Sequence, residues 1–202
     1  MSIKAILWDF SGVLVKPHEG KSHEEYARLL GVSSHDLELF YNGELSRRMD
    51  LGEISREEFY KSIIAELNLD PNVISFFNDS FENVFTLNTT LLEYIQALPE
   101  KIRVGLLSNY SDQLRPPLEE ELKIANLFDD IIISSEIKLR KPDEDIYQTA
   151  LERLNVVAHD TIFVDDRMEN IESAEKVGMH AILYQSNEQV ITHINDLISR
   201  LR

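Results

Sequence analysis

The chain has 202 residues, of which 43% are hydrophobic, a formal net charge of −16 and an isoelectric point of about 4.7. Nucleic acid is not an expected partner, because phosphate backbones are bound by clustered Lys and Arg side chains. The sequence contains no cysteine, which excludes disulfides, thiolate catalysis and thiolate-bound metals. We recognise no signal peptide and no apolar run long enough to span a membrane. The sequence therefore predicts a soluble, cytoplasmic protein without a membrane partner.

The amino-terminal segment, residues 3–15, is the first that carries candidate chemistry. Apolar residues of strand length lead into Asp9, and the small-residue turn Phe10-Ser11-Gly12 follows at once. A single Asp at this position is most simply the polar end of a strand. However, ligands of open α/β sheets bind beyond the carboxyl ends of the strands, where Asp9 would lie. Three later segments repeat this pattern, and the repetition favours Asp9 as a nucleophile.

The pattern of elements divides the chain into two kinds of region. Residues 16–88 contain helical patterns only, including a capping box formed by Ser55 and Glu58, whereas residues 42–49 are less regular. Elsewhere buried-type strands alternate with helices. We expect these strands over about 102–107, 131–133, 161–164 and 180–183. The sequence thus predicts an α/β fold: a doubly wound, parallel-sheet, Rossmann-like core (1–15 and 89–202) with a small inserted helical cap domain (16–88).

The ends of the expected strands carry polar residues whose chemical types complement one another. Each of them alone could be a turn former, a helix cap or an exposed cation. Three carboxylates at one sheet edge, however, repel one another unless a cation joins them, and hard oxygen ligands select Mg²⁺. With a lysine nearby, the negative charge of an incoming phosphate is neutralised, and a hydroxyl and an amide can bind phosphoryl oxygens. The residues concerned are Asp9, Ser108, Asn109, Lys141, Asp165 and Asp166.

These segments resemble the four ordered motifs of the haloacid dehalogenase-like hydrolase superfamily, and the resemblance covers essentially the whole chain. The insertion after the first motif resembles that superfamily's small cap domain. Within the superfamily, the chain is similar to sugar-phosphate phosphatases and to the amino-terminal phosphatase domain of soluble epoxide hydrolases. Gly52-Glu53-Ile54-Ser55, followed by Phe59, is similar to a cap signature of that subgroup. The four motifs are Asp9-Phe10-Ser11-Gly12-Val13, Leu107-Ser108-Asn109, Arg140-Lys141-Pro142, and Phe163-Val164-Asp165-Asp166 with Asn170.

The resemblance implies a role for each matched residue. Asp9 would be the nucleophile and a metal ligand, and the backbone carbonyl of Ser11 a second ligand. Asp166 would be the main carboxylate ligand of the last motif, with Asp165 beside it. The transferring phosphoryl group would be held by Ser108 and Asn109, and its charge balanced by Lys141. The implied activity is a Mg²⁺-dependent phosphatase, a phosphoric monoester hydrolase that acts through an aspartyl-phosphate on a small phosphorylated metabolite such as a sugar phosphate.

One position departs from the family pattern. Typical phosphatases of this superfamily carry a second Asp two residues after the nucleophile as a general acid and base, and here that position is Ser11. A missing acid/base is expected to lower the rate roughly 10²–10⁴-fold. Two alternatives therefore stay open: a metal-independent 2-haloacid dehalogenase, and a catalytically weak ligand-binding or regulatory protein. The clustered acids Asp165 and Asp166 argue against the first, and Ser11 is the best support for the second.

Four further residues are weaker candidates for the site. His18 and His23 follow the first strand and could be neighbours of the site, while Arg47 and Arg48 could reach a substrate from the cap. For the two arginines a solvated face is the simpler interpretation. The sequence does not indicate the oligomeric state or the physiological substrate.

Overall fold

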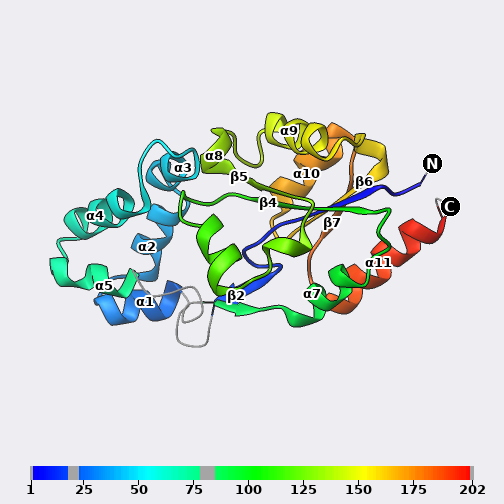
Figure 1. Ribbon diagram of the computed structural model, residues 1–202. Helices are drawn as coiled ribbons and strands as arrows, with labels where there is room; N and C mark the ends of the chain where they lie inside the picture. Colours follow the sequence, from blue (N-terminus) through cyan, green and yellow to red (C-terminus); the bar gives the residue numbers. More distant parts are fainter. Residues whose placement is uncertain (1, 18–22, 78–84, 201–202) are drawn as a thin grey trace.

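The computed structural model describes residues 2–17, 23–77 and 85–200 (Figure 1). Its centre is a parallel five-stranded sheet in the order β5-β4-β1-β6-β7, which confirms the predicted fold class. The strands are Ala5–Trp8 (β1), Arg103–Ser108 (β4), Asp130–Ile133 (β5), Thr161–Asp165 (β6) and His180–Leu183 (β7). This order places β1 between β4 and β6, so the carboxyl ends of three motif-bearing strands are neighbours.

Helices cover both faces of the sheet, because successive side chains of a buried strand point to opposite faces. Ile6 and Trp8 of β1 face the helices α7 and α11, whereas Leu7 faces α9 and α10, and all three are fully buried. Figure 1 shows these two helical layers on either side of the sheet. The helices of the core are Thr89–Gln96 (α7), Ser134–Ile137 (α8), Glu144–Leu154 (α9), Met168–Val177 (α10) and Asn187–Arg200 (α11).

The short elements of the core connect these layers. A π-helical turn follows the paired prolines, where the sequence predicts a helix that is started or broken, and two 3₁₀ turns precede strands. These turns are Pro117–Glu121 (η2), Ala125–Leu127 (η3) and Ala158–Asp160 (η4).

Residues 23–77 of the inserted segment form helices joined by short turns and lie to one side of the sheet (Figure 1). It has its own apolar cluster, in which Leu37, Phe59 and Ile63 are fully buried. Its elements are His23–Leu30 (α1), Ser34–Tyr41 (α2), Glu44–Asp50 (α3), Arg56–Glu66 (α4), Pro71–Val73 (η1) and Ile74–Phe77 (α5). The division into a core and a cap domain stays a prediction, which this separate cluster supports.

Two details of the insertion follow from local chemistry. The Ser55 hydroxyl accepts from the Glu58 backbone N–H while the Glu58 carboxylate accepts from that of Ser55, so the expected capping box is present. Residues 42–49 are more regular than expected, since most of them form α3. Gly43 makes this second helix possible directly after α2, because a Cβ atom there would lie 2.4 Å from the carbonyl oxygen of Leu39.

A short antiparallel ribbon, which the sequence pattern did not reveal, joins the insertion to the core. Val15–Pro17 (β2) pairs with Phe85–Leu87 (β3). β2 crosses the predicted boundary between residues 15 and 16, whereas β3 lies within the segment predicted as all helical. Three-residue strands are too short to show a period of two, which explains why they were not predicted.

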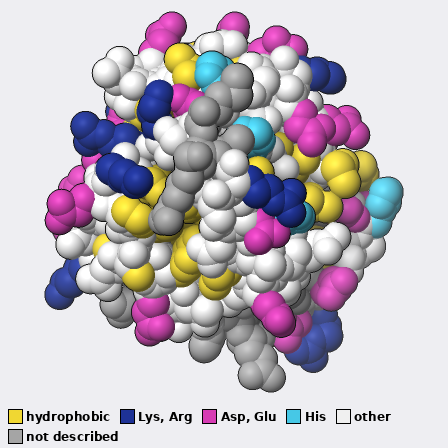
Figure 2. Space-filling view, turned by 90° about the vertical axis from the view of Figure 1, so that its right-hand side faces the viewer, with side chains coloured by type: hydrophobic (Ala, Val, Ile, Leu, Met, Phe, Trp, Pro, Cys, Tyr) yellow, Lys and Arg dark blue, Asp and Glu magenta, His cyan; other side chains and the backbone are white. Residues whose placement is uncertain are grey.

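The opposite end of the core carries both described chain ends. On that face Lys and Arg side chains are interspersed with Asp and Glu and with small apolar patches (Figure 2). Among the described residues, no helix is both long and apolar enough to cross a membrane. The cytoplasmic location stays a prediction.

Candidate active site

Asp9 lies directly after β1, at the carboxyl edge of the sheet. Its backbone N–H donates to the Val164 carbonyl of β6 at 2.9 Å, which continues the ladder of the two strands and holds the residue in place. Only 6% of Asp9 is exposed. A carboxylate in such a position needs a cation, because its charge is removed from most of its water.

Lys141 supplies that cation. Its ammonium donates to Asp9 Oδ1 at 2.6 Å and to Asp165 Oδ2 at 2.7 Å, and the lysine is itself buried. Burial alone would lower the pKa of Lys141, but the Asp165 and Asp9 carboxylates raise it above its ordinary value. The lysine is therefore charged at neutral pH and joins the ends of β1 and β6.

The two acids of the last motif have different surroundings. Asp165 is fully buried, and its oxygens accept from the Arg167 backbone N–H at 2.8 Å and from the Asn170 amide at 3.0 Å, besides Lys141. Asp166 is exposed at the mouth of the site. Asp165 is thus occupied as the counter-ion of Lys141, whereas Asp166 is the acid that can take an external ligand.

Gly12 provides the space for Asp166. This glycine has φ +86°, and a Cβ atom on it would lie 2.2 Å from Asp166 Oδ2. Any other residue would be strained in this conformation and would collide with the carboxylate. The requirement explains why a glycine follows Ser11 in the turn.

The three carboxylates form a possible metal site. One oxygen each from Asp9, Asp165 and Asp166 can be chosen so that all three lie within 4.8 Å of one another. Burial, together with the charges of Asp165 and Asp166, raises the pKa of Asp9 to about 7, although Lys141 acts in the opposite direction. Burial and Asp165 also raise the pKa of Asp166. An all-oxygen donor set with excess negative charge fits Mg²⁺, which would relieve this repulsion.

The end of β4 brings Ser108 and Asn109 to the same edge, but in different roles. The Ser108 hydroxyl is buried and has no hydrogen-bond partner among the described residues, and Ser108 is not part of the cavity lining, so its predicted role at the phosphoryl group stays a prediction. The Asn109 amide instead clamps the backbone of Lys141: its nitrogen donates to the Lys141 carbonyl, and its oxygen accepts from the Lys141 N–H, both at 2.8 Å. The side chain of Asn109 therefore positions the lysine.

A cavity of about 820 Å³ opens in front of Asp9 and Lys141 and continues toward the inserted helices. Ser11 lies on its wall, as expected for the position that usually carries the acid/base. The inserted segment adds apolar and aromatic side chains together with polar ones. The wall residues from the insertion are Tyr41, Asn42, Gly43, Ser46, Met49, Asp50, Arg56 and Tyr60.

The turn between α3 and α4 contacts the core beside the site. Arg140 Nη2 lies 3.2 Å from Asp50 Oδ2, and the Lys138 ammonium donates to the Gly52 carbonyl at 2.7 Å. Gly52 has φ +62°, and a Cβ atom there would lie 2.7 Å from the Ser135 carbonyl oxygen. The glycine of the predicted cap signature therefore permits this close approach.

Sequence reasoning missed three cationic residues of the cavity, Arg56, Arg140 and Arg167. The Arg56 guanidinium lies over the Tyr60 ring, 5.3 Å from its centroid, and Nη1 is 3.3 Å from Gln113 Oε1 of the core. Arg56 is the first residue of α4, where a cation opposes the helix dipole. That conflict is the one signal in the sequence that could have singled it out.

The weaker candidates do not gain support. Arg47 and Arg48 pair with Glu44 and Glu53 at 3.7 Å and 3.5 Å, and neither arginine lines the cavity. His18 and the side chain of His23 lie outside the described residues.

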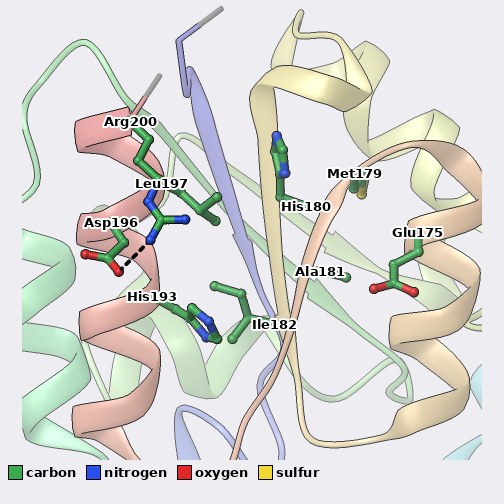
Figure 3. Close-up of a pocket in the computed structure, with 9 residues that line it drawn as sticks. All are labelled: Glu175, Met179, His180, Ala181, Ile182, His193, Asp196, Leu197 and Arg200. Atoms are coloured by element: carbon green, nitrogen blue, oxygen red, sulfur yellow. Dashed lines mark ion pairs between the residues drawn. The ribbon is translucent and has the colours of Figure 1, made fainter. Parts of the chain in front are cut away.

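A second hollow, of about 350 Å³, lies at the amino end of the edge strand β7 (Figure 3). His180 accepts or donates one hydrogen bond with the His159 carbonyl at 3.1 Å, and Asp196 pairs with Arg200 at 3.6 Å. None of the sequence-predicted site residues lines this hollow. Ligands of parallel sheets bind at the carboxyl ends of strands, which favours the cavity at Asp9 as the functional site.

Comparisons with known proteins agree with this arrangement. The model of a hydrolase family, the haloacid dehalogenase-like hydrolases, matches residues 3–178. The chain is 26% identical over 179 residues to a sesquiterpene phosphatase of Aspergillus oryzae, covering 88% of each chain. It is 27% identical to a D-ribitol-5-phosphate phosphatase of Bacteroides thetaiotaomicron, covering 87% of this chain and 89% of the relative. A drimenol cyclase of Aspergillus calidoustus is 25% identical over 96% of this chain, which spans only 36% of that relative.

Solved structures show the same fold. A HAD family enzyme from Bacteroides thetaiotaomicron, determined as a magnesium complex, superposes with a TM-score of 0.77 at 21% identity, covering 96% of this chain and 99% of that one. A predicted HAD-like hydrolase from Porphyromonas gingivalis superposes with a TM-score of 0.76 at 22% identity, covering 98% of both chains.

Proposed function

Because the chain belongs to the haloacid dehalogenase-like hydrolases, we propose that it is a Mg²⁺-dependent phosphatase of small phosphate esters with Asp9 as its nucleophile. The observation that carries this proposal is the buried contact of Asp9 with Lys141 at 2.6 Å, in the wall of a cavity large enough for a metabolite. The phosphatases among the relatives support the same reaction class.

In the proposed reaction, an oxygen of Asp9 attacks phosphorus and the ester oxygen leaves, so that the phosphoryl group is carried on the carboxylate; water then hydrolyses this aspartyl-phosphate. The Lys141 ammonium stabilises the charge on the phosphoryl oxygens. The Asp165 carboxylate and the Asn109 amide hold Lys141 in place for this role. The Ser108 hydroxyl donates to a phosphoryl oxygen. Mg²⁺, held by Asp9, Asp166 and the Ser11 carbonyl, would supply charge neutralisation.

Hydrolysis of p-nitrophenyl phosphate, measured with Mg²⁺ and then with EDTA, tests the proposal. We expect turnover that depends on the metal. Metal-independent release of halide from a 2-haloacid would instead favour a dehalogenase. Retained binding of phosphate without any turnover would favour a binding or regulatory protein.

We predict that Asp166→Asn weakens Mg²⁺ binding more than Asp165→Asn does. Asp166 is exposed toward an external ligand, whereas the oxygens of Asp165 already accept from Lys141, Arg167 and Asn170. A loss of roughly 10–100-fold in affinity is expected for Asp166→Asn. Calorimetric titration of both variants with Mg²⁺ measures the difference, and the opposite order would reverse the two assignments.

Ser11 gives a second prediction, because it leaves the site without the usual carboxylic acid. Ser11→Asp is expected to raise kcat/KM on alkyl phosphates selectively, since poor leaving groups need a proton and p-nitrophenolate departs without one. The measurement is the ratio of kcat/KM on an alkyl and an aryl phosphate for both proteins. If that ratio stays flat or falls in a folded, Mg²⁺-binding variant, an ordered water or an inserted-helix residue already supplies the proton, and the new charge only repels Asp9 and Asp166.

A further inference from the structure

Asp50 is an acid of the inserted segment that neither the motifs nor the proposed chemistry uses. It is the last residue of α3, it lines the cavity of Asp9 and Lys141, and only 10% of its side chain is exposed. An acid is seldom buried to this extent unless its oxygens have partners. The partners of Asp50 therefore indicate what this part of the cavity is built to hold.

Within the described part of the chain, Asp50 has one such partner. Arg140 Nη2 lies 3.2 Å from Asp50 Oδ2, and no described residue donates a hydrogen bond to the other oxygen, Oδ1. Arg140 is similarly incomplete, because its buried Nε has no hydrogen-bond partner among the described residues. The wall of the cavity thus offers one acceptor, Asp50 Oδ1, that the described residues leave without a donor, whereas Arg140 Nε is enclosed and out of reach of a ligand.

The place of this pair in the cavity relates it to a particular part of the substrate. Arg140 immediately precedes Lys141, whose backbone is clamped by Asn109 and whose ammonium lies at the nucleophile. Asp50 is therefore close to the phosphoryl end, on the side of the inserted helices, where the alcohol part of a phosphate ester would enter.

We propose that Asp50, oriented by Arg140, binds a hydroxyl group of the alcohol part of the substrate and so selects phosphate esters of polyols or sugars. The inference rests on the proposed phosphatase function. A carboxylate accepts hydrogen bonds only, so its ligand must bring a donor. A hydroxyl group brings such a donor and carries no charge.

Two other kinds of alcohol fit this wall less well. A purely apolar alcohol would leave the buried carboxylate oxygen without a donor, and such a mismatch is what lets sites built for hydroxyl groups reject analogues that lack them. An ammonium group would meet the positive charges of Arg140, Lys141 and Arg167, which already act on Asp50. A neutral hydroxyl avoids both costs.

The test compares a five-carbon polyol phosphate with n-pentyl phosphate, which has the same chain length and no hydroxyl groups. Binding is measured by calorimetry to Asp9→Asn and to Asp9→Asn/Asp50→Asn, with Mg²⁺ present, so that the result does not depend on turnover. We expect the first protein to bind the polyol ester roughly 10–100-fold more tightly than the pentyl ester, and the second to lose that preference.

A matched control separates this effect from a general loss of stability. Glu136→Gln breaks the Arg115–Glu136 pair, which has contacts of 2.6 Å and 2.8 Å and lies within the core away from the cavity. In the Asp9→Asn background it should leave the preference for the polyol ester unchanged. The proposal is overturned if Asp50→Asn weakens both esters equally, or if the polyol ester has no advantage before Asp50 is changed. Absence of hydrolysis by the wild-type protein would count against the proposed function alone.

Discussion

Asp9→Asn is expected to abolish phosphatase activity, by roughly 10⁴-fold or more, while the protein stays folded. The amide keeps the shape of the side chain and can still accept from the Lys141 ammonium, which now lies 2.6 Å from Asp9 Oδ1. It has no anionic oxygen to attack phosphorus, and the hydroxyl groups on the cavity wall, such as that of Ser11, are not ionised at neutral pH. Release of phosphate under single-turnover conditions measures the change. A purified, folded variant with activity close to that of the wild type would remove Asp9 from the mechanism.

The same substitution should stabilise the protein when no metal is present. Burial raises the pKa of Asp9 to about 7 from an ordinary value of 3.8, so the folded protein holds the proton of Asp9 more tightly than the unfolded chain does. The resulting contribution to the free energy of unfolding is complete below pH 3.8 and is lost as the pH rises through about 7. The asparagine does not titrate. In EDTA, the advantage of Asp9→Asn in melting temperature should therefore grow between about pH 4 and pH 7, and Mg²⁺ should reduce it. An advantage that is independent of pH would mean that Asp9 ionises freely in the folded protein.

The parts of the site that lie at strand ends were predictable from the sequence. In a parallel sheet all strands end at one edge, so Asp9, Ser108 and Asp166 had to come together once their strands were recognised. The chemical types of the residues then indicated the phosphate chemistry. Their individual contacts were not predictable, because these depend on side-chain directions. The Asn109 amide, for example, lies at the cavity but forms both of its hydrogen bonds with the backbone of Lys141.

The inserted helices were only partly predictable from the sequence. The capping box at Ser55 gave the start of α4 to within one residue, because capping is a local interaction. The contact between Asp50 and Arg140 joins residues 90 positions apart in the sequence, and nothing in the local pattern of either residue specifies it. The α3 helix was likewise missed, since it needs the close approach of Gly43 to α2. Substrate selection depends on such contacts between the two regions.

Lys141→Met should remove both activity and stability. Methionine has a similar length, but it leaves Asp9 and the fully buried Asp165 without the ammonium that contacts both. Removing one partner of a buried ion pair typically lowers the free energy of unfolding by about 3–5 kcal/mol, because a charge stays buried without compensation. Turnover should fall roughly 10³-fold or more, since the developing charge on the phosphoryl oxygens loses its counter-ion. Urea unfolding without metal and assays with saturating Mg²⁺ measure the two effects.

A second substitution separates these two roles of Lys141. Asp165→Asn in the Lys141→Met background removes one of the uncompensated charges, so the double variant should regain part of the lost stability. It should regain no activity, because the phosphoryl group still has no ammonium beside it. Lys101→Met, which changes an exposed lysine on a turn of the core, is the control for loss of positive charge and should alter neither quantity appreciably. If the double variant is less stable than Lys141→Met, Asp165 supports the site through its contacts with Arg167 and Asn170 more than through its charge.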